Sequence, residues 1–168
     1  MSLIAAIAAS CCMYRSRGET NMVSISEPAV QSYILYSSIL GLKVLAMAIL
    51  TARVRYRKKV FANEEDARRT KGIVKYDDPD VERVRRAHLN DLESIPVFLV
   101  LALYVTTGPV AAWATLLFRT YTISRIIHTI VYAIVPLPQP SRALAYFIPY
   151  FIMWYMGVQV RGRTTSRK

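Results

Sequence analysis

The sequence predicts an all-α integral membrane protein, folded as a single four-helix bundle. Of its 168 residues, 54% are hydrophobic, yet the formal net charge is +11. Twelve of the 22 Lys and Arg residues lie in positions 53–86 and four more in 161–168, whereas long stretches elsewhere are nearly uncharged. Apolar segments joined by basic loops are typical of helices that span a bilayer, and this length suits one domain.

The first 27 residues are predicted to form an extension before the bundle. Residues 4–13 are apolar, but they lack the basic stretch that normally precedes the core of a signal peptide. A secretory leader stays an alternative. Met22 is an alternative start, because the helix-initiating sequence Ser26-Glu27-Pro28 follows it closely.

The bundle is predicted to cover residues 28–161, with spans at about 29–54, 80–107, 110–135 and 141–161 and a basic tail at 162–168. The first span contains an apolar run that is interrupted by Lys43 and has roughly the ~20 residues needed to cross a bilayer. A basic stretch and a polar loop follow it. The loop ends at an Asp-Pro-Asp sequence, which is a helix-start signal.

The other three spans differ in polarity. The second is charged over its first turns and plainly apolar only in 94–106, and the third carries Arg119, Arg125 and His128. A proline-rich connection at 136–140 cannot continue a helix. The uncharged run at 143–160 after it is the strongest single transmembrane signal of the chain.

Charge asymmetry predicts the orientation in the membrane. Four spans place both termini on one face, which then carries Arg15, Arg17 and the basic tail. The opposite face carries the twelve basic residues of 53–86 together with Arg142. The positive-inside rule therefore places the long first loop in the cytosol.

Two classes of site are disfavoured by composition. The basic segment is interleaved with acidic residues, namely Glu64, Glu65, Asp66, Asp77, Asp78, Asp80 and Glu82. Binding to nucleic-acid phosphates is therefore not expected. The only cysteines, Cys11 and Cys12, are adjacent and offer neither a disulfide framework nor a zinc site, so no metal is predicted.

Polar residues within the spans are patterned along two helical faces. In the second span they recur at i, i+4 and i+7: Arg86, Asn90 and Glu93. In the third span they recur at i, i+3 and i+7: Arg125, His128 and Tyr132. Each set shares one face of its helix, so the two stripes are predicted to line one polar pocket.

Ionisable groups at membrane depth cost about 2.5–3.5 kcal/mol each and need a partner or a function. A structural ion pair between Arg86 and Glu93 is the plainer interpretation. However, the two stripes and Arg142 together contain three arginines against one glutamate. An anionic ligand would balance this excess of positive charge.

Several other polar residues are interpreted as structural. Lys43 lies deep in the first span, where Asp91 is its expected partner, and His88 faces away from the stripe of Arg86. The aromatic residues of the last span are expected to face lipid or to pack. Tyr146 is the exception, because it lies one turn after Arg142.

Four segments carry a resemblance to a known family: VRYRKKVFANEED, DPDVERVRRAHLNDLE, RIIHTIVY and PLPQPSRALAY. In this order, over roughly residues 28–158, they resemble the membrane-associated eicosanoid and glutathione metabolism (MAPEG) superfamily. The resemblance implies a homotrimer in the endoplasmic reticulum membrane or the outer mitochondrial membrane. It also implies glutathione as co-substrate, bound between neighbouring subunits.

The resemblance further implies a role for each site residue. Glutathione has two carboxylates, one ammonium and one thiol; the matching carboxylate partners are Arg55, Arg86 and Arg125. Glu93 matches the ammonium partner, and three residues match further hydrogen-bonding positions: Asn90, His128 and Tyr132. Arg142 matches the cation that stabilises the thiolate, with Tyr146 beside it and Asp66 as the acidic loop partner of Arg142. A thiol ionises with a pKa of about 8.5, so a nearby cation is its simplest activator.

The branch of the family is less sharply defined by these motifs. Leu89, the PLPQP connection and Ala143 favour a glutathione transferase with peroxidase activity, acting on lipophilic electrophiles or lipid hydroperoxides. VRYRKK and Tyr146 favour a glutathione-dependent prostaglandin E synthase, although Ala143 replaces a serine of that pattern. A non-catalytic lipid-binding scaffold is a third alternative, and a basic channel would need both stripes to face a continuous pore.

Overall fold

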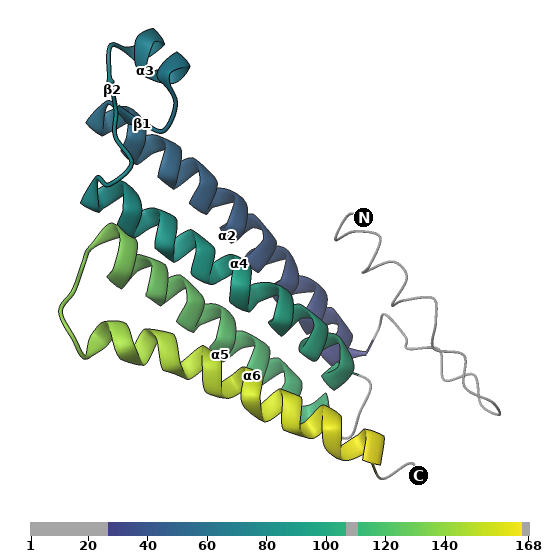
Figure 1. Cartoon of the computed structure of the whole chain (residues 1–168). Helices are drawn as coiled ribbons and strands as arrows, with labels where there is room; N and C mark the ends of the chain where they lie inside the picture. The colour runs from purple at the N-terminus through teal and green to yellow at the C-terminus, as the bar shows by residue number, and fades with distance from the viewer. Residues whose placement is uncertain (1–26, 107–110, 166–168) are drawn as a thin grey trace.

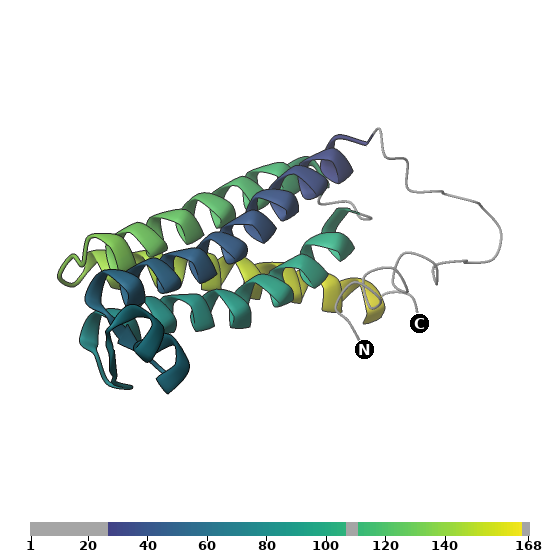
Figure 2. The same cartoon turned by 90° about the horizontal axis from the view of Figure 1, so that it is seen from above.

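The computed structural model describes residues 27–106 and 111–165, so most of the predicted extension lies outside the described residues. Four long helical segments run side by side, as Figures 1 and 2 show from two directions. They are α2 (Pro28–Lys58), α4 (Pro79–Thr106), α5 (Ala111–Thr129) with the π-helical turn η1 (Ile130–Ile134), and α6 (Ser141–Thr165). The predicted all-α four-helix bundle is confirmed.

The segment between α2 and α4 is predicted from sequence only as a polar loop, but it has regular structure. It contains β1 (Val60–Phe61), α3 (Glu64–Thr70) and β2 (Ile73–Val74). The two strands pair in parallel, with Val60 opposite Ile73 and Phe61 opposite Val74. Together they form a small cap at one end of the bundle, the same end at which α5 connects to α6 (Figure 1).

Local sequence explains where the helices begin and end. Pro28 occupies the first turn of α2, where its fixed φ is favourable, and Lys59 ends this helix with a left-handed φ of 54°. Asp78 caps α4, because its Oδ1 accepts the backbone N–H groups of Asp80 at 3.1 Å and Val81 at 3.2 Å. Helix α2 ends at Lys58, which is one turn past the predicted end at about residue 54. Helix α6 continues through residues 162–165, which sequence assigns to the tail.

The core consists of aromatic and aliphatic side chains between the helices. Phe98 of α4 stacks on Tyr121 of α5 with ring centroids 3.8 Å apart, and Phe118 meets Phe98 edge-on at 5.8 Å. Leu40 of α2 and Met156 of α6 are fully buried against the same group. This packing fixes how α4 and α5 are rotated, and so fixes where their polar stripes face.

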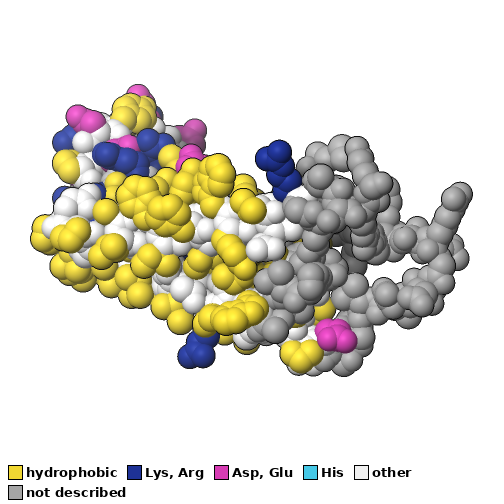
Figure 3. All heavy atoms as spheres, turned by 90° about the horizontal axis from the view of Figure 1, so that it is seen from below, with side chains coloured by type: hydrophobic (Ala, Val, Ile, Leu, Met, Phe, Trp, Pro, Cys, Tyr) yellow, Lys and Arg dark blue, Asp and Glu magenta, His cyan; other side chains and the backbone are white. Residues whose placement is uncertain are grey.

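The outer surface of the bundle suits a bilayer. In the part of the chain that is described, three helices are long and apolar enough to cross a membrane: α2, α4 and the Ser141–Arg161 part of α6. Helix α5 does not meet this criterion and carries Arg119, Arg125 and His128. Figure 3 shows apolar side chains over the bundle and charged ones gathered mainly at the cap. The chain is therefore a multi-pass membrane protein.

Candidate functional site

A pocket of about 510 Å³ opens between α4, the α5–η1 segment and the start of α6. It is lined by Arg86, Leu89, Asn90, Glu93, His128, Tyr132, Gln139, Arg142, Ala143, Tyr146 and Phe147. These residues come from three helices and from the connection between α5 and α6. The pocket therefore depends on the folded bundle and not on any one segment.

Seven of the ten residues that sequence suggests for the site line this pocket: Arg86, Asn90, Glu93, His128, Tyr132, Arg142 and Tyr146. Helical spacing explains why. The stripe of α4 and the His128–Tyr132 part of the other stripe face each other across the same space. Arg142 and Tyr146 are one turn apart on α6 and complete the third wall.

Aromatic rings hold the cation at the centre of the site. The guanidinium carbon of Arg142 lies 4.5 Å from the centroid of the Tyr132 ring, which is a cation–π contact. The Tyr132 ring stacks on His128 at 5.4 Å, and the Tyr146 ring lies 6.4 Å from His128. These contacts fix the direction of Arg142 while leaving its N–H groups available for hydrogen bonds.

Two buried nitrogen atoms of the pocket have no hydrogen-bond partner among the described residues. They are Nε of Arg142 and Nδ1 of His128. Buried polar atoms are nearly always paired in native proteins, so unpaired ones at a pocket wall indicate a ligand with complementary groups. Nε of Arg142 is a donor and requires an acceptor such as a carboxylate or thiolate.

The charges of the pocket are not balanced within it. Arg86 and Arg142 face one carboxylate, Glu93. The ion pairs formed by the described residues do not include one between Arg86 and Glu93, both of which are exposed. Both ends of this stripe thus face the open pocket, where they are available to groups of opposite charge.

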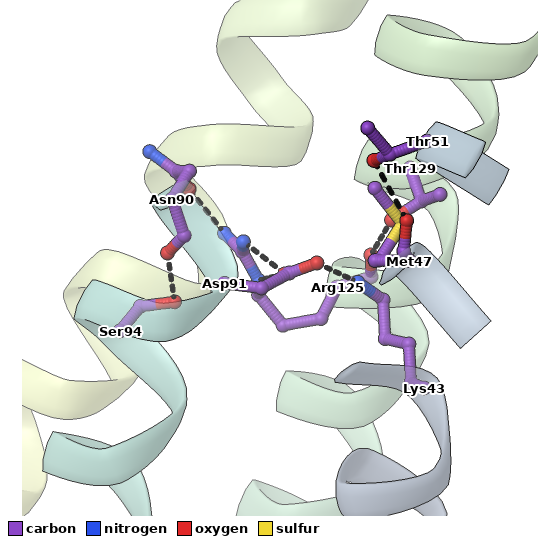
Figure 4. Close-up of polar contacts among 8 residues, drawn as sticks. All are labelled: Lys43, Met47, Thr51, Asn90, Asp91, Ser94, Arg125 and Thr129. Atoms are coloured by element: carbon purple, nitrogen blue, oxygen red, sulfur yellow. Dashed lines mark hydrogen bonds and ion pairs between the residues drawn. The ribbon is translucent and has the colours of Figure 1, made fainter. Parts of the chain in front are cut away.

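Arg125 lies next to the pocket but does not line it. The residue is 1% exposed, and its side chain donates to Asp91 through Nε, at 3.1 Å, and through Nη2. A third nitrogen, Nη1, donates to Asn90 Oδ1 at 2.9 Å. Figure 4 shows this group between the helices, with Lys43 paired to the other side of Asp91. The contact expected between Lys43 and Asp91 is therefore present.

The remaining sequence candidates lie toward the cap. Arg55 is half-buried near the end of α2, and Asp66 is exposed on α3. Neither residue lines the pocket of this single chain. His88 is half-buried and also absent from the lining, consistent with a packing role.

Four lining residues are not among those predicted for the site: Leu89, Gln139, Ala143 and Phe147. From sequence, Leu89 and Ala143 bear only on the branch of the family. Gln139 lies in the proline-rich connection, and its Oε1 accepts the backbone N–H of Ala143 at 3.3 Å, which caps the start of α6. Phe147 is 49% exposed at the pocket wall beside Tyr146. From sequence, Phe147 belongs to the aromatic residues expected to face lipid or to pack, although it directly follows Tyr146 on the helix that carries Arg142. No pattern marks Gln139.

The arrangement can bind a small zwitterion next to an apolar compound. Its lining provides two guanidinium groups, one carboxylate, two amides and one imidazole. Its rim includes Leu89, Tyr146 and Phe147, all exposed on the apolar surface of the bundle. A polar reactant and a membrane-dissolved reactant can therefore meet at Arg142.

Comparison with known proteins agrees with this arrangement. The MAPEG family model matches residues 33–161. Microsomal glutathione S-transferase 1 of Bos taurus is 43% identical over 148 residues, which cover 83% of this chain and 94% of the bovine protein. For the human protein of that name, identity is 41% over 143 residues, covering 81% and 91% of the two chains.

A second kind of relative matches equally broadly. Prostaglandin E synthase of Equus caballus is 39% identical over 142 residues, which cover 83% of this chain and 92% of the horse protein. The chain is about as similar to the prostaglandin E synthase as to the glutathione S-transferases, so these sequence identities define the family but do not select one of its two branches. The chain belongs to the MAPEG family.

Proposed function

We propose that this chain is a membrane-bound glutathione transferase that also reduces lipid hydroperoxides. The observation that carries the proposal is the pocket, in which Arg142 has an unpaired Nε beside a stripe containing Arg86, Asn90 and Glu93. Glutathione is a tripeptide with two carboxylates, one ammonium and one thiol. The two arginines and Glu93 of this lining complement one carboxylate, the thiolate and the ammonium group.

Each charged residue has a distinct proposed task. Arg86 binds a carboxylate of glutathione, and Glu93 binds its ammonium group. Arg142 stabilises the thiolate, which is the reactive form of a thiol. Lowering the pKa of the thiol by two units requires only ~2.7 kcal/mol of preferential stabilisation, which a cation in a poorly solvated site can supply.

The reaction then follows from the position of the thiolate. Its sulfur attacks an electrophilic carbon of a lipophilic compound, forms a thioether and releases the leaving group, if there is one. With a hydroperoxide, the sulfur attacks the terminal oxygen and a second glutathione completes the reduction. The products are then one alcohol, one water molecule and oxidised glutathione. Exposed Phe147 and Leu89 at the rim support entry of such compounds from the bilayer.

The proposed assembly is a homotrimer that binds glutathione between subunits. Arg55 and Asp66 lie outside the pocket of one chain, and we assign them to the part of the site that a neighbouring copy completes. The proposed location is the endoplasmic reticulum membrane, with the outer mitochondrial membrane as a second site and the cap in the cytosol.

Glutathione consumption tests the proposal. Purified protein in detergent is supplied with glutathione and either a lipophilic arylating electrophile or a fatty-acid hydroperoxide, and loss of free thiol is measured against product. We expect one glutathione consumed per conjugate and two per hydroperoxide. No saturable glutathione binding and no thiol loss with either compound would contradict the proposal.

A glutathione-dependent prostaglandin E synthase is the second candidate, because relatives with that name match over the same length. This isomerisation uses glutathione without consuming it, so stoichiometry separates the two. Prostaglandin E formed from its endoperoxide precursor without net loss of thiol would favour the synthase. Ala143 argues against it, since a synthase mechanism that needs a side-chain hydroxyl at this position has none here.

A further inference from the structure

A buried ion cluster lies directly behind the pocket. It consists of Lys43 of α2, Asp91 of α4 and Arg125 of α5, whose side chains are 9%, 0% and 2% exposed. Lys43 Nζ donates to Asp91 Oδ2, while Nε and Nη2 of Arg125 both donate to Asp91 Oδ1. One carboxylate thus joins three helices, and its two oxygens are both occupied.

Among the described residues, one hydrogen bond between side chains connects the ion cluster to another residue. Nη1 of Arg125 donates to Oδ1 of Asn90 at 2.9 Å. A guanidinium group is planar, so its double contact with Asp91 fixes the direction in which Nη1 points. Asn90 precedes Asp91 on α4 and lines the pocket, whereas Asp91 does not. The contact therefore connects a rigid buried group to the pocket wall.

The contact determines how the Asn90 amide is oriented. Arginine has donors only, so the amide oxygen must face it and the amide nitrogen must face the other way. Figure 4 shows the nitrogen of Asn90 turned away from Arg125. The side chain consequently presents N–H groups, and no acceptor, away from the ion cluster.

We propose that the ion cluster is a positioning device that holds Asn90 as a pure hydrogen-bond donor in the pocket. The inference rests on the proposed glutathione site and deepens it. The atom of glutathione that meets Asn90 is then an acceptor, a carboxylate or peptide carbonyl oxygen. Arg125 acts through Asn90 and does not itself touch the ligand.

The burial of Arg125 supports an indirect role, in which this residue orients Asn90 and does not contact glutathione. Its three guanidinium nitrogens, Nε, Nη1 and Nη2, all donate to Asp91 or Asn90. With 1% of the residue exposed, the guanidinium has no open face for a carboxylate of the ligand. A direct role as carboxylate partner, which the family resemblance implies, would require this group to leave both contacts.

A double-mutant cycle tests the proposal. Arg125→Lys keeps a charge for Asp91 but removes the planar fork that holds Asn90, and Asn90→Ala removes the amide. Dissociation constants for glutathione are measured by calorimetry on the purified full chain, and KM and kcat are measured at saturating electrophile. We expect each single change to raise the dissociation constant about tenfold. The double variant should bind no worse than Asn90→Ala alone, because Arg125 acts only through that residue.

Kinetics provide a readout that general destabilisation would not mimic. The KM for glutathione should rise in each variant, while kcat at saturating glutathione changes by less than about twofold. Arg119→Lys on the same helix is the matched control, since Arg119 is exposed and does not line the pocket. This control should leave the dissociation constant unchanged.

Three results would overturn the inference. The first is additive losses in the double variant, which would indicate that Arg125 contacts glutathione directly. The second is unchanged glutathione binding in Arg125→Lys, and the third is wild-type binding in Asn90→Asp. The last variant keeps an oxygen toward Arg125 but has no N–H to offer, so it also tests the inference if Arg125→Lys does not fold. Absence of glutathione binding in the unmodified protein would contradict the proposed function as well. If the unmodified protein binds glutathione but the binding losses of Arg125→Lys and Asn90→Ala are additive, only this inference is contradicted.

Discussion

At the scale of single residues, the arginines at the pocket differ in how their nitrogens are engaged. Arg125 is buried, and its donors are used by Asp91 and Asn90. Arg142 rests on the Tyr132 ring with Nε unpaired. Arg125 therefore belongs to the ion cluster behind the pocket, whereas Arg142 is available to a ligand.

The ring of Tyr132 should matter more than its hydroxyl for placing Arg142. Removing the ring in Tyr132→Leu deletes a cation–π contact worth about 0.5–2 kcal/mol, so kcat should fall about 2- to 30-fold. Tyr132→Phe keeps the ring and should retain most of kcat. Turnover at saturating glutathione measures both; equal losses in the two variants would assign the effect to the hydroxyl instead.

Glu93 should recognise the ammonium group of glutathione. Glu93→Gln removes the charge of an exposed pocket carboxylate, and KM for glutathione should rise about tenfold, near the lower end for a charged hydrogen bond. The matched probe is a glutathione analogue without the amino group. Unmodified protein and variant should bind that analogue equally, and a persistent difference would show that Glu93 has another role.

Helical spacing predicts most of the residues that line the pocket, but not the ion cluster behind it. Arg86, Asn90 and Glu93 share one face of any straight helix, so their convergence follows from sequence alone. The choice of Asp91 as partner of Arg125 depends on how α4 and α5 are rotated against each other, which the stacking of Phe98 on Tyr121 fixes. Spacing within one helix carries no information about that rotation.

At the scale of elements, the cap is the part that sequence reasoning describes least well. Its strands have two residues each, too short for an alternating pattern to be recognised. The turn depends on Gly72, where a Cβ atom would lie 2.5 Å from the backbone oxygen of Lys59 and 2.8 Å from the Phe61 ring. The parallel pairing of β1 with β2 thus requires glycine at this position.

Gly72→Ala should therefore open the cap without unfolding the bundle. Added methyl contacts below 3 Å force the backbone apart, so limited proteolysis should cut residues 59–78 faster than in the unmodified protein. Gly41→Ala is the matched control, because a Cβ there meets nothing within 4 Å and alanine favours the helix by up to about 1 kcal/mol. Unchanged cleavage in Gly72→Ala would show that the strand pairing does not need this glycine.

At the scale of the whole molecule, charge and hydropathy separate along the bundle axis. On the face that Figure 3 shows, charged side chains gather mainly at the cap, while apolar side chains cover most of the helices. The pocket lies toward the cap end, because it is lined by the connection between α5 and α6. With the cap in the cytosol, glutathione would enter from the aqueous side and lipophilic compounds from the bilayer.

A single exposed cysteine tests this orientation. Lys75 lies in the cap with 43% of its side chain exposed. In a chain with Cys11 and Cys12 changed to serine, Lys75→Cys should react with a membrane-impermeant maleimide in sealed microsomes. Labelling that appears only after permeabilisation would place the cap in the lumen, contrary to the positive-inside rule.

The central claim is that Arg142 stabilises a glutathione thiolate in the pocket, and an ultraviolet difference spectrum tests it most directly. Glutathione is added to the detergent-purified protein at neutral pH, and absorbance in the thiolate band is compared with that of Arg142→Ala and of the control Arg119→Ala. We expect the band in the unmodified protein and the control, and its loss in Arg142→Ala. A band that persists in Arg142→Ala, or no band together with no measurable glutathione binding in any of the three proteins, would contradict the claim.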